Sequence, residues 1–167
     1  MPDTKSNLLN AFGGESKASR KYLAYADKAE DEGNYQIARL FRAASAAETI
    51  HALSHIRASE TIGSTEENLL DAINGESDEF TNMYPEMIER AKSDGDLAAE
   101  SSLQRACTVE KVHHAMYKQA LSALKAGDII HKKPVFVCQV CGNTVAGELP
   151  DSCSVCGVSK KNFTEIE

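Results

Sequence analysis

The chain has 167 residues, 42% of them hydrophobic, which is enough for one ordinary domain, or one domain and a small appendage, with a real core. It carries 18 Lys and Arg against 25 Asp and Glu, a net charge of -7, so it lacks the large cationic surface that nucleic acids or acidic membranes require. No apolar run approaches the roughly 20 residues of a membrane span, and the polar start has no signal-peptide core. We therefore expect a soluble, cytoplasmic protein that binds neither nucleic acid nor membrane.

Residues 1–131 have the pattern of a helical domain, because apolar residues recur there at steps of three and four. Ser64 and Glu67 have the spacing of a capping box at the start of one helix. Breaks at turn-forming residues predict four helices, at about 5–32, 35–62, 65–92 and 97–126. We therefore expect a mainly α fold, with a four-helix bundle in this part.

Each predicted helix carries ionisable side chains on its inner face, which should be apolar in a bundle. An isolated carboxylate in an apolar interior costs several kcal/mol or changes its protonation, so converging carboxylates need a cation to hold them. Metal binding is the simplest explanation of this pattern. The predicted ligands, helix by helix, are Glu15, then Glu48 and His51, then Glu76 and Glu79, then Glu110 and His113.

Two of the helices repeat the same motif, Glu48-x-x-His51 and Glu110-x-x-His113, which places a carboxylate and an imidazole one turn apart. One such motif occurs by chance in many helices, but two that are matched by Glu on the other helices favour a metal site. This donor set is typical of ferritin-like di-iron or di-manganese carboxylate proteins. Oxygen donors with two imidazoles suit iron or manganese better than copper or structural zinc.

The composition changes from residue 132 onward to Pro, Val, Gly and Cys, after a linker near Gly127 to Pro134. Short strands are expected at 135–137 and 145–147. Two C-x-x-C-G motifs supply four thiolates that can surround one ion tetrahedrally: Cys138, Cys141, Cys153 and Cys156. We expect residues 132–167 to form a small domain folded around iron, as an electron carrier, or around zinc, as a structural ribbon.

These motifs together resemble the rubrerythrin family over nearly the whole chain. The resemblance includes the segments Phe12-Gly13-Gly14-Glu15-Ser16, Met83-Tyr84-Pro85-Glu86 and Cys156 to Phe163. It implies a ferritin-like bundle with a rubredoxin-like tail, and a non-haem di-iron peroxidase that reduces hydrogen peroxide to water in defence against oxidative stress. It also implies iron in the tail, which would receive electrons from a rubredoxin or an NAD(P)H-dependent reductase and pass them to the di-iron site.

The resemblance further implies roles for single residues. Glu48 and Glu110 would bridge the two irons, and Glu79 would be the ligand that exchanges with His51 when the irons change oxidation state. Tyr22 and Tyr84 resemble family tyrosines near the site. The tail departs from the family pattern, since the chain has no Trp, so we expect its electron-transfer surface to differ from that of better-known members.

The predicted link between the second and third helices is short for a ferritin-like bundle. If these helices meet at Ile62 and Thr65, a crossover would have to climb about 30 Å with three residues that span about 10 Å. We therefore expect a homodimer in which the third and fourth helices pack against the first two helices of a second chain.

Two other functions fit parts of the pattern. A ferroxidase or iron-handling protein shares the bundle, but it has no evident need of a four-cysteine electron carrier. A non-enzymatic, metal-dependent sensor with a zinc ribbon would explain the tail. It would lack the red colour of a ferric tetrathiolate.

Overall fold

The computed structural model of the protein describes residues 2–128 and 133–167. Within them, helical segments precede a small cysteine-rich sheet, so the predicted mainly α class is confirmed. The chain divides into two compact units, residues 1–63 and residues 64–167. None of the described helices has the length and hydrophobicity of a membrane span. The predicted boundary at 131 and part of the predicted linker fall on residues 129–132, outside the described residues.

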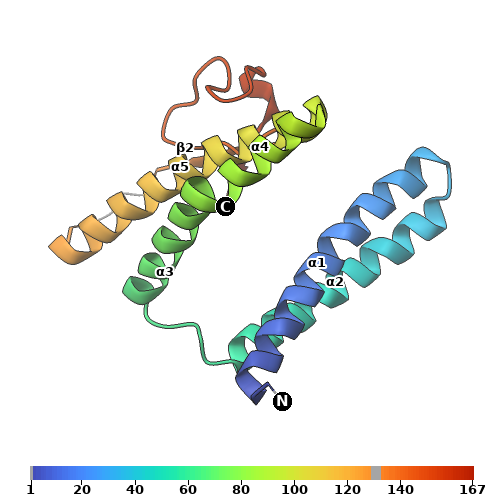
Figure 1. Cartoon of the computed structure of the whole chain (residues 1–167), viewed down its shortest axis with the longest axis horizontal. Helices are drawn as coiled ribbons and strands as arrows, with labels where there is room; N and C mark the ends of the chain where they lie inside the picture. Colours follow the sequence, from blue (N-terminus) through green and yellow to red (C-terminus); the bar gives the residue numbers. More distant parts are fainter. Residues whose placement is uncertain (1, 129–132) are drawn as a thin grey trace. The chain divides into compact units, whose positions relative to one another are not determined.

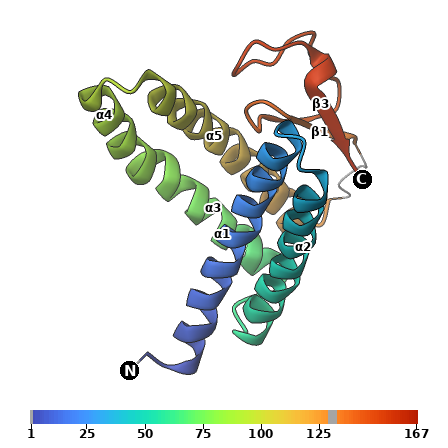
Figure 2. The same cartoon turned by 90° about the vertical axis from the view of Figure 1, so that its right-hand side faces the viewer.

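The first unit is a hairpin of two long helices, α1 (Thr4–Asp31) and α2 (Tyr35–Ala58), which run side by side in both views (Figures 1 and 2). Gly33 has φ +79° in the connection, a conformation that glycine adopts without strain. The core of the hairpin is built from small residues, because Ala26, Ala29 and Ala38 are buried with Phe41 packed against them. Small side chains allow the two helix axes to approach closely.

The helix α2 ends four residues before the predicted residue 62. Ser59 is buried, and its Oγ donates to the carbonyl oxygen of Ile56 at 2.8 Å. Glu60 then takes a left-handed conformation with φ 55°. A serine that bonds the backbone in this way competes with helix propagation, so the helix ends here rather than at Gly63.

The second unit begins with α3 (Thr65–Asp78), where the predicted capping box between Ser64 and Glu67 is confirmed. The continuous helix expected over 65–92 is wrong, because a π-helical turn, η1 (Glu79–Met83), separates α3 from α4 (Tyr84–Asp94). Pro85 gives the reason: it has no N–H, and in a regular α-helix its ring would meet the carbonyl group of residue 81. The wider turn removes that clash while the chain continues as a helix.

The helix α5 (Leu97–Ala126) packs against α3 and α4. The tail forms a three-stranded antiparallel sheet in the order β2-β1-β3. Its strands are β1 (Val135–Cys138), β2 (Thr144–Ala146) and β3 (Phe163–Ile166), with the short 3-10 helix η2 (Lys160–Asn162) before β3. The first two strands match the predicted ones within a residue, and β3 was not predicted.

Candidate metal centres

One cluster of possible metal ligands lies on the helical hairpin. Glu15 on α1 and Glu48 and His51 on α2 each offer a ligand atom, and the three atoms lie within 4.8 Å of one another. Nδ1 of His51 is 2.9 Å from Oε2 of Glu48. The His51 side chain is 56% exposed and Glu48 21% exposed, so this cluster is open on one side.

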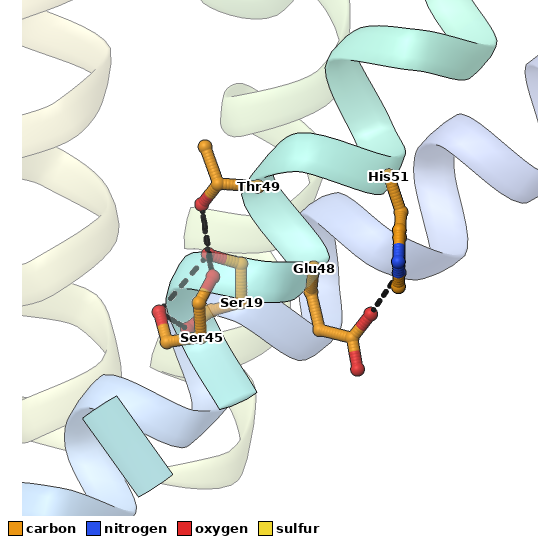
Figure 3. A network of polar contacts seen from close by, with 5 residues as sticks. All are labelled: Ser19, Ser45, Glu48, Thr49 and His51. Carbon is orange, nitrogen blue, oxygen red and sulfur yellow. Dashed lines mark hydrogen bonds and ion pairs between the residues drawn. The ribbon is translucent and has the colours of Figure 1, made fainter. Parts of the chain in front are cut away.

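A group of hydroxyl side chains fixes the two helices beside this cluster (Figure 3). Ser19 Oγ donates to the carbonyl oxygen of Ser45 at 3.1 Å, and Ser45 Oγ donates to that of Ser19 at 2.9 Å. Thr49 Oγ1 lies 2.9 Å from Ser19 Oγ and donates to the same Ser45 carbonyl. Because Ser19 is one turn after Glu15 and Thr49 follows Glu48, these bonds set the distance between the helices at the level of the ligands.

A second cluster lies in the other unit. Glu76 on α3 and Glu110 and His113 on α5 bring three ligand atoms within 4.8 Å of one another. Nδ1 of His113 is 2.9 Å from Oε2 of Glu110 and 3.7 Å from Oε1 of Glu76. Their exposed fractions are 27% for His113, 18% for Glu76 and 15% for Glu110. This cluster is therefore more enclosed than the first.

The carboxylates of the second cluster repel one another. Burial, a hydrogen bond with Glu110 and the charges of Glu110 and Glu79 raise the pKa of Glu76 to about 7. Burial and then the charge of Glu110 also raise the pKa of Glu79. A bound cation would offset this repulsion between the carboxylates. Carboxylate oxygens together with an imidazole nitrogen are donors that fit iron or manganese.

Glu79 is not among the three atoms that converge in this cluster. It opens the π-helical turn η1, and π-helical turns inside α-helices are frequent at functional sites. The charges of Glu110 and His113 both affect its pKa, so Glu79 lies near the cluster without closing on it. This position is compatible with a carboxylate that binds metal only part of the time.

The two tyrosines differ in their surroundings. Tyr84 follows η1 and is half-buried, and burial together with the charges of Glu110 and Glu79 raises its pKa. Tyr22 is half-buried on α1, with its ring centroid 6.2 Å from those of Tyr25 and Phe41. The structure thus places Tyr84 by the second cluster and Tyr22 in an aromatic group of the hairpin.

The four tail cysteines form a third cluster, with their Sγ atoms within 4.8 Å of one another. Cys138 and Cys156 are 3.7 Å apart and Cys141 and Cys153 are 3.6 Å apart, as free thiols. Tetrahedral ligands at about 2.3 Å from one ion would be separated by about 3.8 Å. The spacing therefore fits one tetrathiolate ion, and is far longer than the roughly 2 Å of a disulfide.

In this third cluster, backbone groups favour the thiolate form of Cys153, whereas burial raises the pKa of Cys141 to about 12. Burial acts to raise the pKa of Cys153, but N–H groups of Cys156 and Val155 bond its sulfur, and the pKa falls to about 6. Gly142 and Gly157 have φ +80° and +75°, so each C-x-x-C-G motif needs its glycine to turn the chain. The glycines of the motif are thus part of the ion-binding geometry.

The sequence did not indicate every residue around these clusters. Thr144 Oγ1 lies 3.0 Å from Nε2 of His113, yet a lone threonine in a strand carries no recognisable signal. The small hydroxyl residues between α1 and α2 could have been found, because Ser19 and Ser45 occupy inner-face positions one turn from predicted ligands.

Comparison with known proteins gives matches over both parts of the chain. The family model described as rubrerythrin matches residues 6–121, and the model of the rubrerythrin rubredoxin-like domain matches residues 136–164. Rubrerythrin-2 of Clostridium acetobutylicum is 35% identical over 96% of this chain and 95% of its own length. Nigerythrin of Nitratidesulfovibrio vulgaris is 35% identical over 96% of this chain and 85% of its own.

Solved structures of nigerythrin are also similar to the chain. The fully reduced, all-ferrous state aligns with a TM-score of 0.59 and 32% identity, covering 99% of this chain and 88% of that one. The partially reduced state aligns with a TM-score of 0.61 and 31% identity over the same shares.

Proposed function

Because the chain belongs to the rubrerythrin family, whose members are iron-binding oxidoreductases, we propose that it is a non-haem di-iron peroxidase that reduces hydrogen peroxide to water. The observation that carries this proposal is the presence, in one chain, of two Glu/His clusters and a four-cysteine cluster. The first two are suited to hold iron next to a small oxidant, and the third is suited to carry single electrons to it.

Each Glu/His cluster would supply one half of the di-iron centre. Glu48 and Glu110 would bridge the ions, and Glu79 would replace His51 as a ligand when the oxidation state changes. Bound iron supplies the two electrons that one hydrogen peroxide needs, and two protons complete the formation of two waters. The carboxylates balance the change in charge at the irons. Tyr22 and Tyr84 would act as hydrogen-bond donors beside the centre.

The tail would hold one iron between its four thiolates, and zinc would fit the same sulfurs. With iron, the tail would accept electrons singly from a rubredoxin or from an NAD(P)H-dependent reductase and pass them on. Free thiols in such a site persist in a reducing compartment, which supports a cytoplasmic location.

The experiment that tests the activity is anaerobic stopped-flow mixing of the reduced, iron-loaded protein with hydrogen peroxide. Ferric thiolate absorption reports the tail. The proposal expects rapid oxidation of both centres, much slower oxidation by dioxygen, and impairment by Glu79→Ala. The exposed Glu86 on α4 offers a matched control, Glu86→Ala, which should react as the parent does. Slow reaction with peroxide but turnover of added Fe(II) with dioxygen would instead identify a ferroxidase.

We also propose that the active form is a homodimer that exchanges helices. The link between α2 and α3 is 59–64, six residues that reach at most about 20 Å. In a ferritin-like bundle, this link would have to run back along both helices. It would cover about 15 Å of α2, from Glu48 to the end of the helix, and about 17 Å of α3, from its start to Glu76. Six residues cannot cover that distance.

Apolar side chains on the hairpin support a partner that covers it. On α2, Leu40 and Ile50 are each 68% exposed, and Ile37 is 49% exposed. Such exposed aliphatic side chains would lose contact with water if a partner covered α2. We propose that this partner is a second copy of the chain, because the hairpin carries one Glu/His cluster and residues 64–167 carry the other.

Complementation tests the exchange directly. Glu48→Ala and Glu110→Ala chains, each inactive alone, are refolded together. In an exchanged heterodimer, the intact hairpin of one chain meets the intact 64–167 unit of the other. About a quarter of the parental sites should then be restored, since half of the dimers are mixed and each has one intact site. A dimer without exchange restores none, and a crystal structure with all ligand helices from one chain would also reject the proposal.

A further inference from the structure

The cysteine tail and the second Glu/His cluster touch within the same compact unit. β2 packs on α5, and a Cβ placed on Gly142 would lie 4.0 Å from Cγ1 of Val109, one turn before His113. At the same contact, Nε2 of His113 lies 3.0 Å from Oγ1 of Thr144. One residue of the tail therefore bonds a predicted ligand of the other metal site.

The direction of this hydrogen bond follows from the partners of Thr144. Its hydroxyl donates to the carbonyl oxygen of Gly142 at 3.2 Å. A hydroxyl has one proton to donate, so the oxygen of Thr144 is left as an acceptor towards His113. When Nδ1 binds an ion and is unprotonated, the neutral ring of His113 carries its proton on Nε2 and donates it to this oxygen. The other ring nitrogen, Nδ1, faces Glu110 and Glu76.

This arrangement selects the ring nitrogen that can bind metal. A histidine ligand binds through an unprotonated nitrogen, and the partner of the second nitrogen sets which one is free. With Nε2–H held by Thr144, Nδ1 is the nitrogen offered to an ion between the carboxylates. Rotation of the ring, which would bring Nε2 towards the carboxylates, would break the bond to Thr144.

The position of Thr144 depends in turn on the cysteine knuckles. The preceding residue, Asn143, is 2% exposed, and its Nδ2 donates to Sγ of Cys153 at 3.6 Å. Its carbonyl oxygen accepts from the N–H of Cys138 at 2.9 Å. Asn143 is thus bonded to both knuckles. A segment of this size has too small a core to fold without its ion, so the ion in the knuckles would determine where Thr144 lies.

We propose that Thr144 is a positioning residue that couples the two kinds of metal site, so that an ion held by the cysteines strengthens metal binding at His113. The inference rests on the metal-binding role given to His113 in the proposed function. Loss of a partner that orients a ligand typically weakens metal binding 10- to 100-fold. The coupling is reciprocal, because each site stabilises the same arrangement of the tail on α5.

The test uses the full chain with zinc in the cysteine site and measures binding of Co(II) to the Glu/His site by visible absorption. Thr144→Val keeps the β-branched shape and removes the hydroxyl, and should weaken Co(II) binding about 10- to 100-fold. Thr144→Ser should restore it. Thr164→Val on the exposed face of β3 is the matched control and should bind as the parent does.

A second readout is independent of affinity. In protein with zinc at all sites, nitrogen NMR should show a protonated Nε2 on His113 whose proton exchanges slowly, and Thr144→Val should remove that protection. Cys153→Ser should weaken Co(II) binding as much as Thr144→Val does, and combining the two should add little further. This non-additivity is expected only if both changes act through one contact.

The outcomes separate this inference from the proposed function. Equal Co(II) affinity and equal proton exchange in Thr144→Val and the parent would overturn the role of Thr144 and leave the peroxidase proposal intact. A parent chain that binds no Co(II) at the Glu/His residues would overturn both. Coupling between the sites in a protein that does not reduce peroxide would support the role of Thr144 and reject the peroxidase.

Discussion

Removing the charge of Glu76 should make the metal-free protein more stable and the metal-loaded protein less stable. The pKa of this carboxyl is about 7 against an ordinary value of 4.5, because of burial and the neighbouring Glu110 and Glu79. Folding favours the protonated form of Glu76. The contribution of this carboxyl to the free energy of unfolding is therefore complete below pH 4.5 and is lost as the pH rises through 7. The difference between a pKa of about 7 and one of 4.5 corresponds to about 3 kcal/mol in the free energy of unfolding.

The Glu76→Gln side chain is neutral at every pH and keeps nearly the same shape. Metal-free Glu76→Gln should match the parent near pH 4.5 and exceed its free energy of unfolding by about 3 kcal/mol at pH 8. Urea unfolding followed by helical circular dichroism measures this difference. Glu86→Gln on the exposed face of α4 should keep the parental pH profile.

Adding Fe(II) without oxygen should make the parent more stable than Glu76→Gln. The parent retains the carboxylate among its metal-binding residues and therefore gains more stability from the ion. Parallel pH profiles of Glu76→Gln and the parent would refute the reasoning. So would a variant that is less stable than the parent in both metal states.

Other predictions concern the parts that hold the sites in place. Ser45→Ala removes the hydroxyl that donates to the buried Ser19 carbonyl and should lower the free energy of unfolding by about 1 kcal/mol; an unchanged urea midpoint would show that the hydroxyl is dispensable. Ser64→Ala removes the capping box with Glu67 and should cost about 1 kcal/mol, and calorimetry that finds no loss contradicts this. A chelator that strips the tail should abolish amide protection in β1–β3 while the α1–α2 hairpin keeps its own, which hydrogen exchange measures residue by residue; tail protection that survives metal removal would show that the sheet folds without its ion.

Local signals in the sequence predicted most of the helical framework. Gly33 and Gly95 end helices in left-handed conformations, and Ser64 begins one through its side chain. Each of these effects acts within one turn, so the sequence pattern contains it. The end of α2 at Ala58 was missed because Ser59 bonds the backbone within a stretch that otherwise reads as helical.

The pairing of Glu with His inside each helix could also be predicted from the sequence. Spacing of three along one helix brings Glu48 to His51 and Glu110 to His113, which the structure places 2.9 Å apart in both pairs. The contact of Thr144 with His113 joins residues 31 positions apart. It arises from the packing of the tail on α5, which no local pattern encodes.

The π-helical turn at Glu79–Met83 lets this stretch hold one extra residue without changing the face of the helix that follows. In it, the N–H of Tyr84 bonds the carbonyl oxygen of Glu79, five residues back, instead of four. Deleting one residue inside the turn would bring this same pair to the α-helical spacing of four, so the helix that follows would keep its face. Tyr84 and the buried Ile88 would keep their place relative to Glu76, and the wide turn alone would be lost. Among related chains, a one-residue gap here would therefore mark a regular helix in place of the wide turn, with the residues on either side in the same register.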